Sequence, residues 1–283
     1  MINKYRENLS PEEKEQWLKR LLRGYGSAVA AFSGGGDSSY LLYVAWLVLK
    51  DKVLAVTSQS PVYPQHHLKR AKDFAHRYGI AHTIIATNEL ASPRFRLNPP
   101  SRCYYCKVEL FTRLKEIAAE KGYNVVIDGS NLDDTSDFRP GLKASRELKV
   151  LSPLIDVGIT KDDVRYLSRK AGLPTWNLPS SACLASRFPY HTAITSEKLK
   201  AVGQGEDFLR ELGFQQVRLR HHGDLARIEV LSSEIPRFLD SNVVGKVIKK
   251  LKSLGYKYIA LDLQGYRTGS MNEVLKTSAK EVP

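Results

Sequence analysis

Two groups of residues in this chain have types and spacings that suit chemistry. The first is the run Ser33-Gly34-Gly35-Gly36-Asp37-Ser38-Ser39, which follows an apolar strand predicted over 28–32 and precedes an apolar helix predicted over 40–49. The glycines let the backbone approach an anion closely, and a helix N-terminus presents unpaired N–H groups to it. Asp37 would repel a bare phosphate, so it predicts a Mg²⁺ ion bound with the pyrophosphate of a nucleotide.

The second group is the three cysteines. Cys103 and Cys106 form a Cys-x-x-Cys pair at a predicted helix start, flanked by Arg102 and Lys107, and Cys183 lies in a separate motif. Helix N-termini and basic neighbours favour thiolates. The pair alone is compatible with a thioredoxin-like exchange site, or with a zinc site completed by a ligand such as His191. Three thiolates can also hold a [4Fe–4S] cluster and leave one iron open to exogenous sulfide, whereas simple burial remains an alternative for Cys183.

A charged hairpin is predicted over 216–230, with a two-residue turn at Gly223-Asp224. Strand alternation sets its charged residues on one face: Arg218, Arg220, Arg227 and Glu229. With that turn, Arg218 lies opposite Glu229 and Arg220 lies opposite Arg227. Opposed arginines repel unless an anion lies between them, so this face is expected to receive a phosphate or carboxylate. The alternative is a solvated face with splayed side chains.

Short apolar strands and longer helices alternate through the first part of the chain. Further strands are predicted over 53–57, 82–86 and 124–128, and helices over 64–78, 104–120 and 161–171. This order predicts a parallel sheet, which binds ligands beyond the carboxyl ends of its strands. Ser58-Gln59-Ser60 and Asp128-Gly129-Ser130-Asn131 follow such ends. The alternative is that they are ordinary polar loops.

A change of pattern after 176–179 predicts a second module. It contains a helix over 196–212, the charged hairpin, a helix over 235–254 and a strand over 258–263. We therefore expect one domain over 1–178 and a smaller α+β domain over 179–283.

Composition indicates the cellular setting. The 283 residues have a net charge of +13, which is spread along the chain without a basic tail, so a small anionic substrate explains it as well as nucleic acid does. The charged N-terminal segment does not resemble a signal peptide, and no apolar stretch is long enough to span a membrane. With three cysteines, an odd number, we expect a reducing cytoplasm and no disulfide framework.

The glycine run resembles the Ser-Gly-Gly-x-Asp-Ser loop of the PP-loop ATP pyrophosphatases, which cleave ATP between the α- and β-phosphates. It is not a P-loop, because no lysine follows the glycines. Gly36 is a departure, since that family usually has an apolar residue there. Three further segments bring the chain close to one family: Arg139-Pro140-Gly141-Leu142-Lys143, Pro179-Ser180-Ser181-Ala182-Cys183-Leu184-Ala185-Ser186-Arg187 and Ala226-Arg227-Ile228-Glu229. Over about 14–272 the chain resembles the LarE family of ATP-dependent sulfur transferases.

The resemblance implies an α/β fold, with a PP-loop (adenine nucleotide alpha-hydrolase-like) parallel sheet that has helices on both faces, followed by the smaller α+β domain. It implies an enzyme that uses ATP and Mg²⁺ to adenylylate a carboxylate of pyridinium-3,5-biscarboxylic acid mononucleotide and convert it to a thiocarboxylate, for the nickel-pincer nucleotide cofactor of lactate racemase. The implied ATP-binding residues are Ser33, Gly34, Gly35, Gly36, Asp37, Ser38, Ser39, Ser58 and Gly129, with Mg²⁺ at Asp37. The implied substrate and sulfur-transfer residues are Cys183, Arg187, Glu206, Arg218, Arg220 and Glu229. A homo-oligomer is expected.

The family has two branches that differ in the source of sulfur. In one, the cysteine matching Cys183 gives up its own sulfur and becomes dehydroalanine. In the other, cysteines matching Cys103, Cys106 and Cys183 hold a [4Fe–4S] cluster whose open iron carries the transferred sulfur; this chain has all three, which favours the cluster branch. Within the same fold, the alternatives are a tRNA thiolase and an amide-forming ligase such as an NAD or GMP synthetase. A non-enzymatic nucleotide sensor is a further alternative.

Overall fold

The computed structural model describes residues 9–136, 139–179, 182–267 and 269–270, in two compact units. The first unit comprises Met1–Phe95 and Pro100–Ser181, and the second comprises Arg96–Pro99 and Ala182–Pro283. The domain division at 178/179 stays a prediction; the structure changes from the first unit to the second after Ser181, and Arg96–Pro99 also belongs to the second unit.

A parallel sheet forms the centre of the first unit. Its strands are β1 (Ala28–Ala31), β2 (Val53–Gln59), β3 (His82–Ala86) and β4 (Val125–Ile127), in the order β3-β2-β1-β4. All three strand pairs are parallel, and Leu151 forms an isolated parallel bridge with Ile127 at the outer edge of β4. The α/β class expected from the alternating pattern is therefore confirmed.

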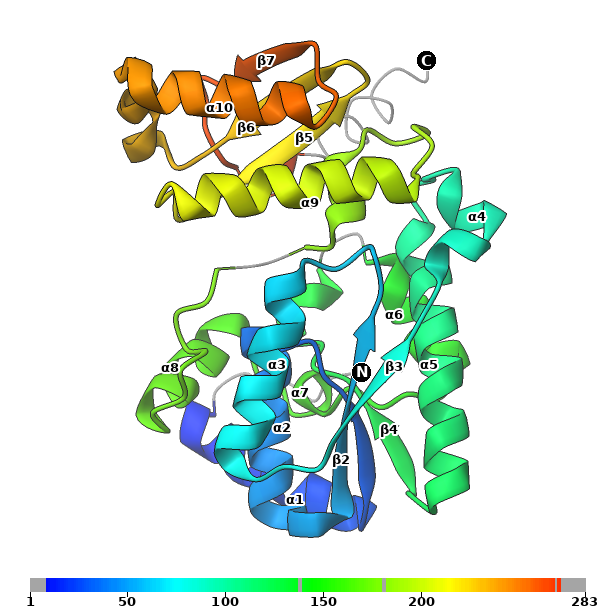
Figure 1. The fold of residues 1–283 in the computed structure, drawn as a ribbon. Helices are drawn as coiled ribbons and strands as arrows, with labels where there is room; N and C mark the ends of the chain where they lie inside the picture. Colours follow the sequence, from blue (N-terminus) through cyan, green and yellow to red (C-terminus); the bar gives the residue numbers. More distant parts are fainter. Residues whose placement is uncertain (1–8, 137–138, 180–181, 268, 271–283) are drawn as a thin grey trace, which may run out of the picture. The chain divides into compact units, whose positions relative to one another are not determined.

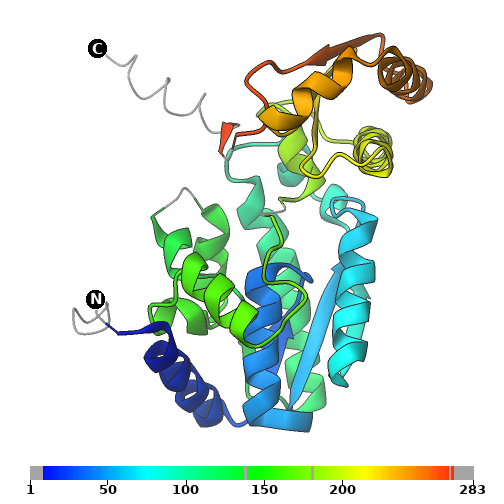
Figure 2. The same ribbon diagram turned by 90° about the vertical axis from the view of Figure 1, so that its left-hand side faces the viewer.

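Helices cover both faces of this sheet (Figure 1). Ala28 and Ala30 on β1 face one layer and Val29 faces the other, because successive side chains of a strand point to opposite sides. The first layer contains α1 (Pro11–Tyr25), α2 (Gly36–Leu49), α3 (Gln65–Tyr78) and α8 (Lys161–Lys170), and the second contains α5 (Arg102–Lys121) and α6 (Pro140–Glu147). Figure 2 shows α1, α2 and α8 side by side in the first layer. Short elements complete the unit: η2 (Lys50–Lys52), η3 (Glu89–Ala91), α4 (Pro93–Arg96), η4 (Leu132–Thr135) and α7 (Pro153–Asp156).

Local sequence explains where two of these helices begin. Helix α2 begins at Gly36 and not at residue 40 as predicted, because Gly35 takes the extended N-cap conformation and the polar residues after it are already helical. Helix α6 begins at Pro140. Proline suits the first turn of a helix, where its missing N–H is not needed.

The second unit is an α+β module. Its elements are η5 (Leu184–Arg187), α9 (Ser196–Glu211), β5 (Arg218–His222), β6 (Leu225–Glu229), η6 (Ser232–Leu239), α10 (Ser241–Ser253) and β7 (Tyr258–Leu261). Strands β5 and β6 form the predicted antiparallel hairpin, in which Arg218 pairs with Glu229 and Arg220 pairs with Arg227. Strand β7 joins β6 in parallel.

The helix predicted over 235–254 is wrong in one respect, because the structure breaks it at Asp240. This residue is extended, and its side chain accepts a hydrogen bond of 2.8 Å from the backbone N–H of Asn242, so it acts as the N-cap of α10. Pro236 lies inside the preceding η6, where a regular α-helix would be disfavoured.

The segment Arg96–Pro99 is held within the second unit by its backbone and by one side chain. Ile194 donates its backbone N–H to the carbonyl of Arg96, and His191 donates its own to the carbonyl of Asn98, both at 2.9 Å. The amide of the buried Asn98 donates to the carbonyl of Pro189 at 2.7 Å.

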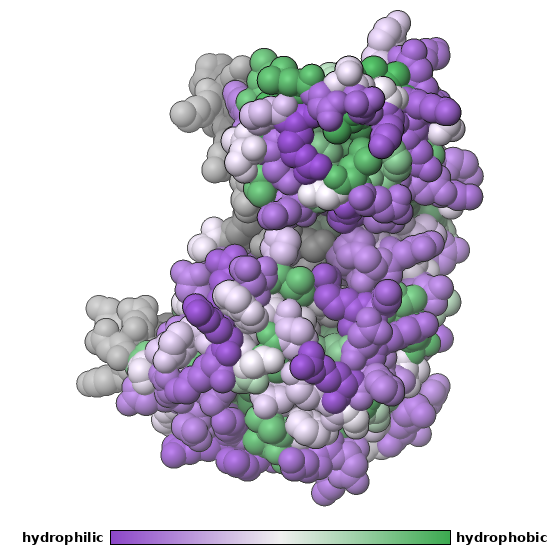
Figure 3. Space-filling view, turned by 60° about the vertical axis from the view of Figure 1, so that its left-hand side comes forward, coloured by the Kyte–Doolittle hydropathy of each residue, from purple (hydrophilic) through white to green (hydrophobic). Residues whose placement is uncertain are grey.

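The surface drawn in Figure 3 is mainly hydrophilic, with apolar residues in separate small patches. In the part of the chain that the structure describes, no helix is long and apolar enough to cross a membrane.

Candidate functional site

Two glycines allow close contact of the glycine loop (33–39) in the first unit: Gly34 with α3, and Gly129, in the loop after β4 (128–131), with the start of α2. Gly34 has a φ of +70°, and a Cβ there would lie 3.0 Å from the backbone nitrogen of Ala71 in α3. A Cβ at Gly129 would lie only 2.8 Å from Cα of Ser38 in the first turn of α2. Both positions therefore require glycine, because another side chain would force two backbone segments apart. Gly129 reaches its place directly after β4, at the carboxyl edge of the sheet.

Hydroxyl groups hold the glycine loop in its shape. The Ser38 hydroxyl donates to the carbonyl of Gly35 at 3.2 Å and lies 3.1 Å from the Ser33 hydroxyl, which accepts the Gly35 N–H at 3.3 Å. Arg70 of α3 donates from Nε to the carbonyl of Gly34 at 2.6 Å. The buried Ser39 hydroxyl has no hydrogen-bond partner among the described residues. The loop is thus formed in advance at the N-terminus of α2, where an anion is favoured.

Asp37 lies at the mouth of this loop, near charges of both signs. Burial raises its pKa, and the nearby Asp134 carboxylate acts in the same direction, whereas Lys161 and a hydrogen bond with Asn131 oppose them. The Lys161 ammonium is 3.8 Å from the Asp37 carboxylate. A divalent cation would favour the charged form of Asp37, and the donor set of carboxylate and amide oxygens fits Mg²⁺.

Ser58 is part of a buried hydrogen-bond chain that the sequence pattern did not reveal. Its hydroxyl bonds to that of Thr87, which donates to the carboxylate of Glu89 at 2.9 Å. Ser60 donates to the same carboxylate, and the Cys106 sulfur lies 3.9 Å from it. Glu89 was missed because it stands in a short 3-10 turn without periodicity. Its only signal is that it follows the carboxyl end of β3.

Cys103 and Cys106 lie in the first two turns of α5. Their i,i+3 spacing sets both sulfurs on one face, and the Tyr63 hydroxyl is 3.4 Å from the buried Cys106 sulfur. Cys183, in the second unit, is the N-cap of η5 and is partly exposed. All three cysteines are free thiols. Within the described residues, no three His, Cys, Asp or Glu side chains are grouped as a metal site would require.

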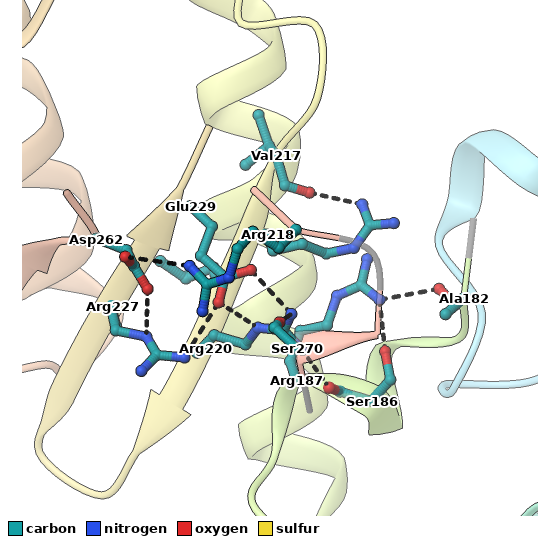
Figure 4. Close-up of polar contacts among 12 residues, drawn as sticks. Ala182, Ser186, Arg187, Val217, Arg218, Arg220, Arg227, Glu229, Asp262 and Ser270 are labelled. Atoms are coloured by element: carbon teal, nitrogen blue, oxygen red, sulfur yellow. Dashed lines mark hydrogen bonds and ion pairs between the residues drawn. The ribbon is translucent and has the colours of Figure 1, made fainter. Parts of the chain in front are cut away.

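Arg187 and Glu206 form the buried centre of the second unit. Arg187 donates from Nε and Nη2 to the two Glu206 oxygens. Its Nη1 donates to the backbone carbonyl of Ala182 at 3.0 Å, as drawn in Figure 4, and to that of Cys183 at 3.2 Å. Arg210 reaches the same carboxylate at 2.8 Å. Burial favours the neutral acid, but the charge and hydrogen bonds of Arg187, with Arg210 and Arg218, lower the pKa of Glu206 to about 2. Arg187 therefore fixes the backbone of Cys183, whether or not it also contacts a ligand.

The anion expected between Arg220 and Arg227 is the protein's own Glu229. Arg220 donates from Nε and Nη2 to the two Glu229 oxygens at 2.9 and 2.8 Å, and Arg227 donates to one of them at 3.1 Å. Arg220 also reaches the carbonyl of Ser186, and Asp262 lies 3.6 Å from Arg227 (Figure 4). Glu229 thus bonds to the arginines on either side of it, although its backbone partner in the sheet is Arg218.

Arg218 is a further buried cation in this group. Its guanidinium lies over the Tyr266 ring at 5.0 Å and donates to the carbonyl of Val217 at 2.8 Å. Burial and the positive charge of Arg187 lower the pKa of Arg218 to about 10, although Glu206 and Tyr266 oppose this. Figure 4 shows the guanidinium groups of Arg187 and Arg218 side by side. An anionic ligand here would relieve the repulsion, and the anion site expected on this face stays a prediction.

Comparison with known proteins gives the family. No family model matches the chain. It is 38% identical over 263 residues to the pyridinium-3,5-bisthiocarboxylic acid mononucleotide synthase of Lactiplantibacillus plantarum, an alignment that covers 93% of this chain and 95% of that protein. It is 42% identical over 264 residues to an uncharacterised protein of Synechocystis sp., covering 93% and 98% of the two chains. A 26% identity over 165 residues to one component of the glutamine-hydrolysing GMP synthase of Thermoplasma volcanium, covering 53% of each chain, fits the PP-loop fold.

The first two relatives align with this chain over nearly their full length. The parallel sheet and the glycine loop fit the PP-loop fold. The chain therefore belongs to the LarE family of ATP-dependent sulfur transferases, within the PP-loop ATP pyrophosphatase superfamily.

Proposed function

We propose that the protein converts a carboxylate of pyridinium-3,5-biscarboxylic acid mononucleotide to a thiocarboxylate at the expense of ATP, for nickel-pincer nucleotide biosynthesis. The similarity to the synthase of Lactiplantibacillus plantarum supports this substrate. The observation that carries the ATP chemistry is the glycine loop itself. Gly129 packs against this loop where a Cβ would not fit, and Asp37 lies at its mouth.

The reaction has two bond exchanges. A substrate carboxylate oxygen attacks the α-phosphorus of ATP, so the bond to the β-phosphate breaks and pyrophosphate leaves. A sulfur nucleophile then attacks the acyl carbon and expels AMP, which is a far better leaving group than oxide. Residues 33–39 bind the phosphates with Mg²⁺ at Asp37, while Ser58 and Gly129 complete the nucleotide site.

Arg218 and its neighbours are proposed to bind the anionic substrate. Arg218 is a buried cation next to Arg187, and both charged oxygens of Glu229 are already engaged by Arg220 and Arg227. A phosphate or carboxylate of the substrate would offset the repulsion between the guanidinium groups of Arg218 and Arg187. Glu206, through Arg187, would position the segment that carries Cys183.

Cys103, Cys106 and Cys183 are proposed to hold a [4Fe–4S] cluster. The i,i+3 pair at the start of α5 fits two thiolate ligands, because both sulfurs lie on one helix face near its N-terminus. When bound, such a cluster supplies an iron with an open position for exogenous sulfide. The alternative source of sulfur within this family is Cys183 itself. Cysteines without disulfides suit a reducing cytoplasm. We further propose that the protein assembles as a homo-oligomer.

The products of ATP cleavage test the central proposal. With Mg²⁺ and the pyridinium substrate, purified protein should release AMP and pyrophosphate in equal amounts, and neither should form without the substrate. Separation of the nucleotides by ion-exchange chromatography distinguishes this from ADP and phosphate. ADP as the main product would contradict the proposed cleavage.

A further inference from the structure

A cavity of about 310 Å³ lies beside the glycine loop and has no part in the proposed reaction. One wall is the outward face of α3, which contributes Lys69, Arg70 and Arg77, and the other is the turn at Pro174-Thr175. Lys69 is eight residues and Arg70 is seven residues before Arg77, so both lie on the same side of the helix as Arg77. The cavity lies entirely within the first unit.

Its charge favours anions. Three permanent cations line it, and they face one carboxylate, that of Asp73. Lys69 has no ion-pair partner among the described residues, although Asp73 is four residues away on the same helix. Phe74 supplies an apolar floor. Cations beside an apolar surface of low dielectric constant attract an anion more strongly than cations in open solvent do.

A buried hydroxyl group also favours a ligand that accepts hydrogen bonds. Thr175 lines the cavity and is 3% exposed, and in the described parts of the chain its hydroxyl has no hydrogen-bond partner. Leaving such a group unpaired is unfavourable, so a ligand that accepts its hydrogen bond would be stabilised. The backbone carbonyl of Thr175 lies 3.5 Å from where a Cβ of Gly36 would stand, and Arg70 bonds to the carbonyl of Gly34. Both walls of the cavity therefore contact the glycine loop.

From the cations, the unpaired hydroxyl and the contact with the loop, we infer that this cavity is a second binding site for a phosphate or pyrophosphate group, separate from the nucleotide site. The ligand is either released pyrophosphate or the phosphate of another small molecule, and the shared chemistry is a tetrahedral oxyanion. The site does not depend on the proposed sulfur transfer.

Isothermal titration calorimetry tests the inference with inorganic pyrophosphate, inorganic phosphate and AMP as separate probes, in buffer that contains Mg²⁺, because the glycine loop is proposed to bind phosphates together with that ion. Wild-type protein should bind pyrophosphate at two sites, and an excess of a non-hydrolysable ATP analogue should displace it from one. The Lys69→Gln/Arg77→Gln double variant should lose at least tenfold affinity at the site that resists the analogue. If the site that resists the analogue binds pyrophosphate more tightly than AMP, its ligand is the released product. If it binds AMP more tightly, its ligand is a phosphate ester.

Lys72→Gln is the matched control, because Lys72 lies on α3 but does not line the cavity. Equal loss of affinity in Lys72→Gln and in the double variant would reduce the effect to general surface charge and overturn the inference. So would complete displacement of pyrophosphate by the ATP analogue. Failure of the analogue to bind, with the second site intact, would instead count against the proposed nucleotide site.

Thr175→Val separates binding from folding. Because the hydroxyl has no partner without ligand among the described residues, this variant should keep or raise the unfolding temperature while weakening pyrophosphate binding severalfold. Unchanged pyrophosphate affinity in a folded Thr175→Val protein would remove the hydroxyl from the site and overturn the inference.

Discussion

Arg187 and Glu206 form a two-pronged ion pair, with N–O distances of 2.7 and 3.0 Å and no solvent exposure of either side chain. Removing one partner of such a pair strands a buried charge. We predict that Glu206→Gln lowers the free energy of unfolding by about 3–5 kcal/mol in urea titrations. Glu211→Gln, an exposed change on the same helix, is the control and should have little effect. Equal stability of the two variants would contradict the prediction.

The same pair predicts a pH dependence. The folded-state pKa of Glu206 is lowered to about 2 from an ordinary value of 4.5, so the ionised carboxylate stabilises the fold. This stabilisation is complete above about pH 4.5 and is lost as the pH falls from there toward 2. Wild-type protein should lose stability more steeply in that window than Glu206→Gln does.

Arg218 and Arg220 are predicted to respond differently to replacement by methionine. Arg218→Met removes a buried cation that Arg187 repels, so stability should hold or rise, while the KM for the anionic substrate should increase roughly 5- to 150-fold, equivalent to about 1–3 kcal/mol. Arg220→Met breaks the bidentate pair with Glu229 and should cost about 3 kcal/mol of stability. ATP affinity, measured by calorimetry, should stay unchanged in Arg218→Met. An unchanged KM in that variant would indicate that the charged face of the hairpin has only a structural role.

Gly129→Ala tests the contact that closes the glycine loop. Its Cβ would lie 2.8 Å from Cα of Ser38, so either the β4 loop or the start of α2 must move. We expect at least tenfold weaker ATP binding and about 1–3 kcal/mol lower stability. Gly245→Ala in α10 meets nothing within 4 Å and should instead stabilise the protein by roughly 0.5–1 kcal/mol. Normal ATP binding by Gly129→Ala would show that the contact does not position the loop.

Asp37→Asn should abolish Mg²⁺-dependent release of pyrophosphate while leaving the melting temperature nearly unchanged, because Asp37 lies at the loop mouth and outside the core. The raised pKa of Asp37 adds a pH effect: protons compete with Mg²⁺ at a higher pH than for an ordinary aspartate. The apparent Mg²⁺ affinity should therefore weaken as the pH falls through this raised pKa. Full Mg²⁺-dependent activity in Asp37→Asn would remove Asp37 from the metal site.

Replacing cysteines separates the two sources of sulfur. If a [4Fe–4S] cluster is held, anaerobically prepared protein should be brown and contain iron and sulfide, and alanine at Cys103, Cys106 or Cys183 should each abolish both signals. If Cys183 is consumed, colourless protein should act once, lose about 34 Da as cysteine becomes dehydroalanine, and tolerate loss of Cys103 or Cys106. Intact-protein mass spectrometry after one turnover of anaerobically reconstituted protein decides between them.

The sequence predicts the sheet and the hairpin well because both rest on local patterns. Continuous apolar runs place β1 and β2 between two helical layers, and the turn at Gly223-Asp224 determines which hairpin residues pair. The start of α2 was predicted late, since helix propensity gives a poor account of a glycine run whose conformation depends on contacts with α3 and Gly129.

Partner choice among the charged residues could not be predicted from pairing alone. Register sets Arg218 opposite Glu229, but long side chains reach along the strand, so Glu229 binds Arg220 and Arg227 instead. Glu89 and its contacts with Ser60 and Thr87 depend on loops that meet only in the folded chain.

Arg96–Pro99 is synthesised early, but its hydrogen-bond partners are synthesised late. These residues belong to the unit whose remaining part begins at Ala182, so their hydrogen bonds with His191 and Ile194 cannot form until nearly a hundred further residues have been synthesised. A fragment that begins at Ala182 would lack Arg96–Pro99, so Asn98, with its left-handed φ of +52°, would no longer donate to the carbonyl of Pro189. The two units are thus interleaved along the chain, so neither corresponds to one uninterrupted stretch of sequence.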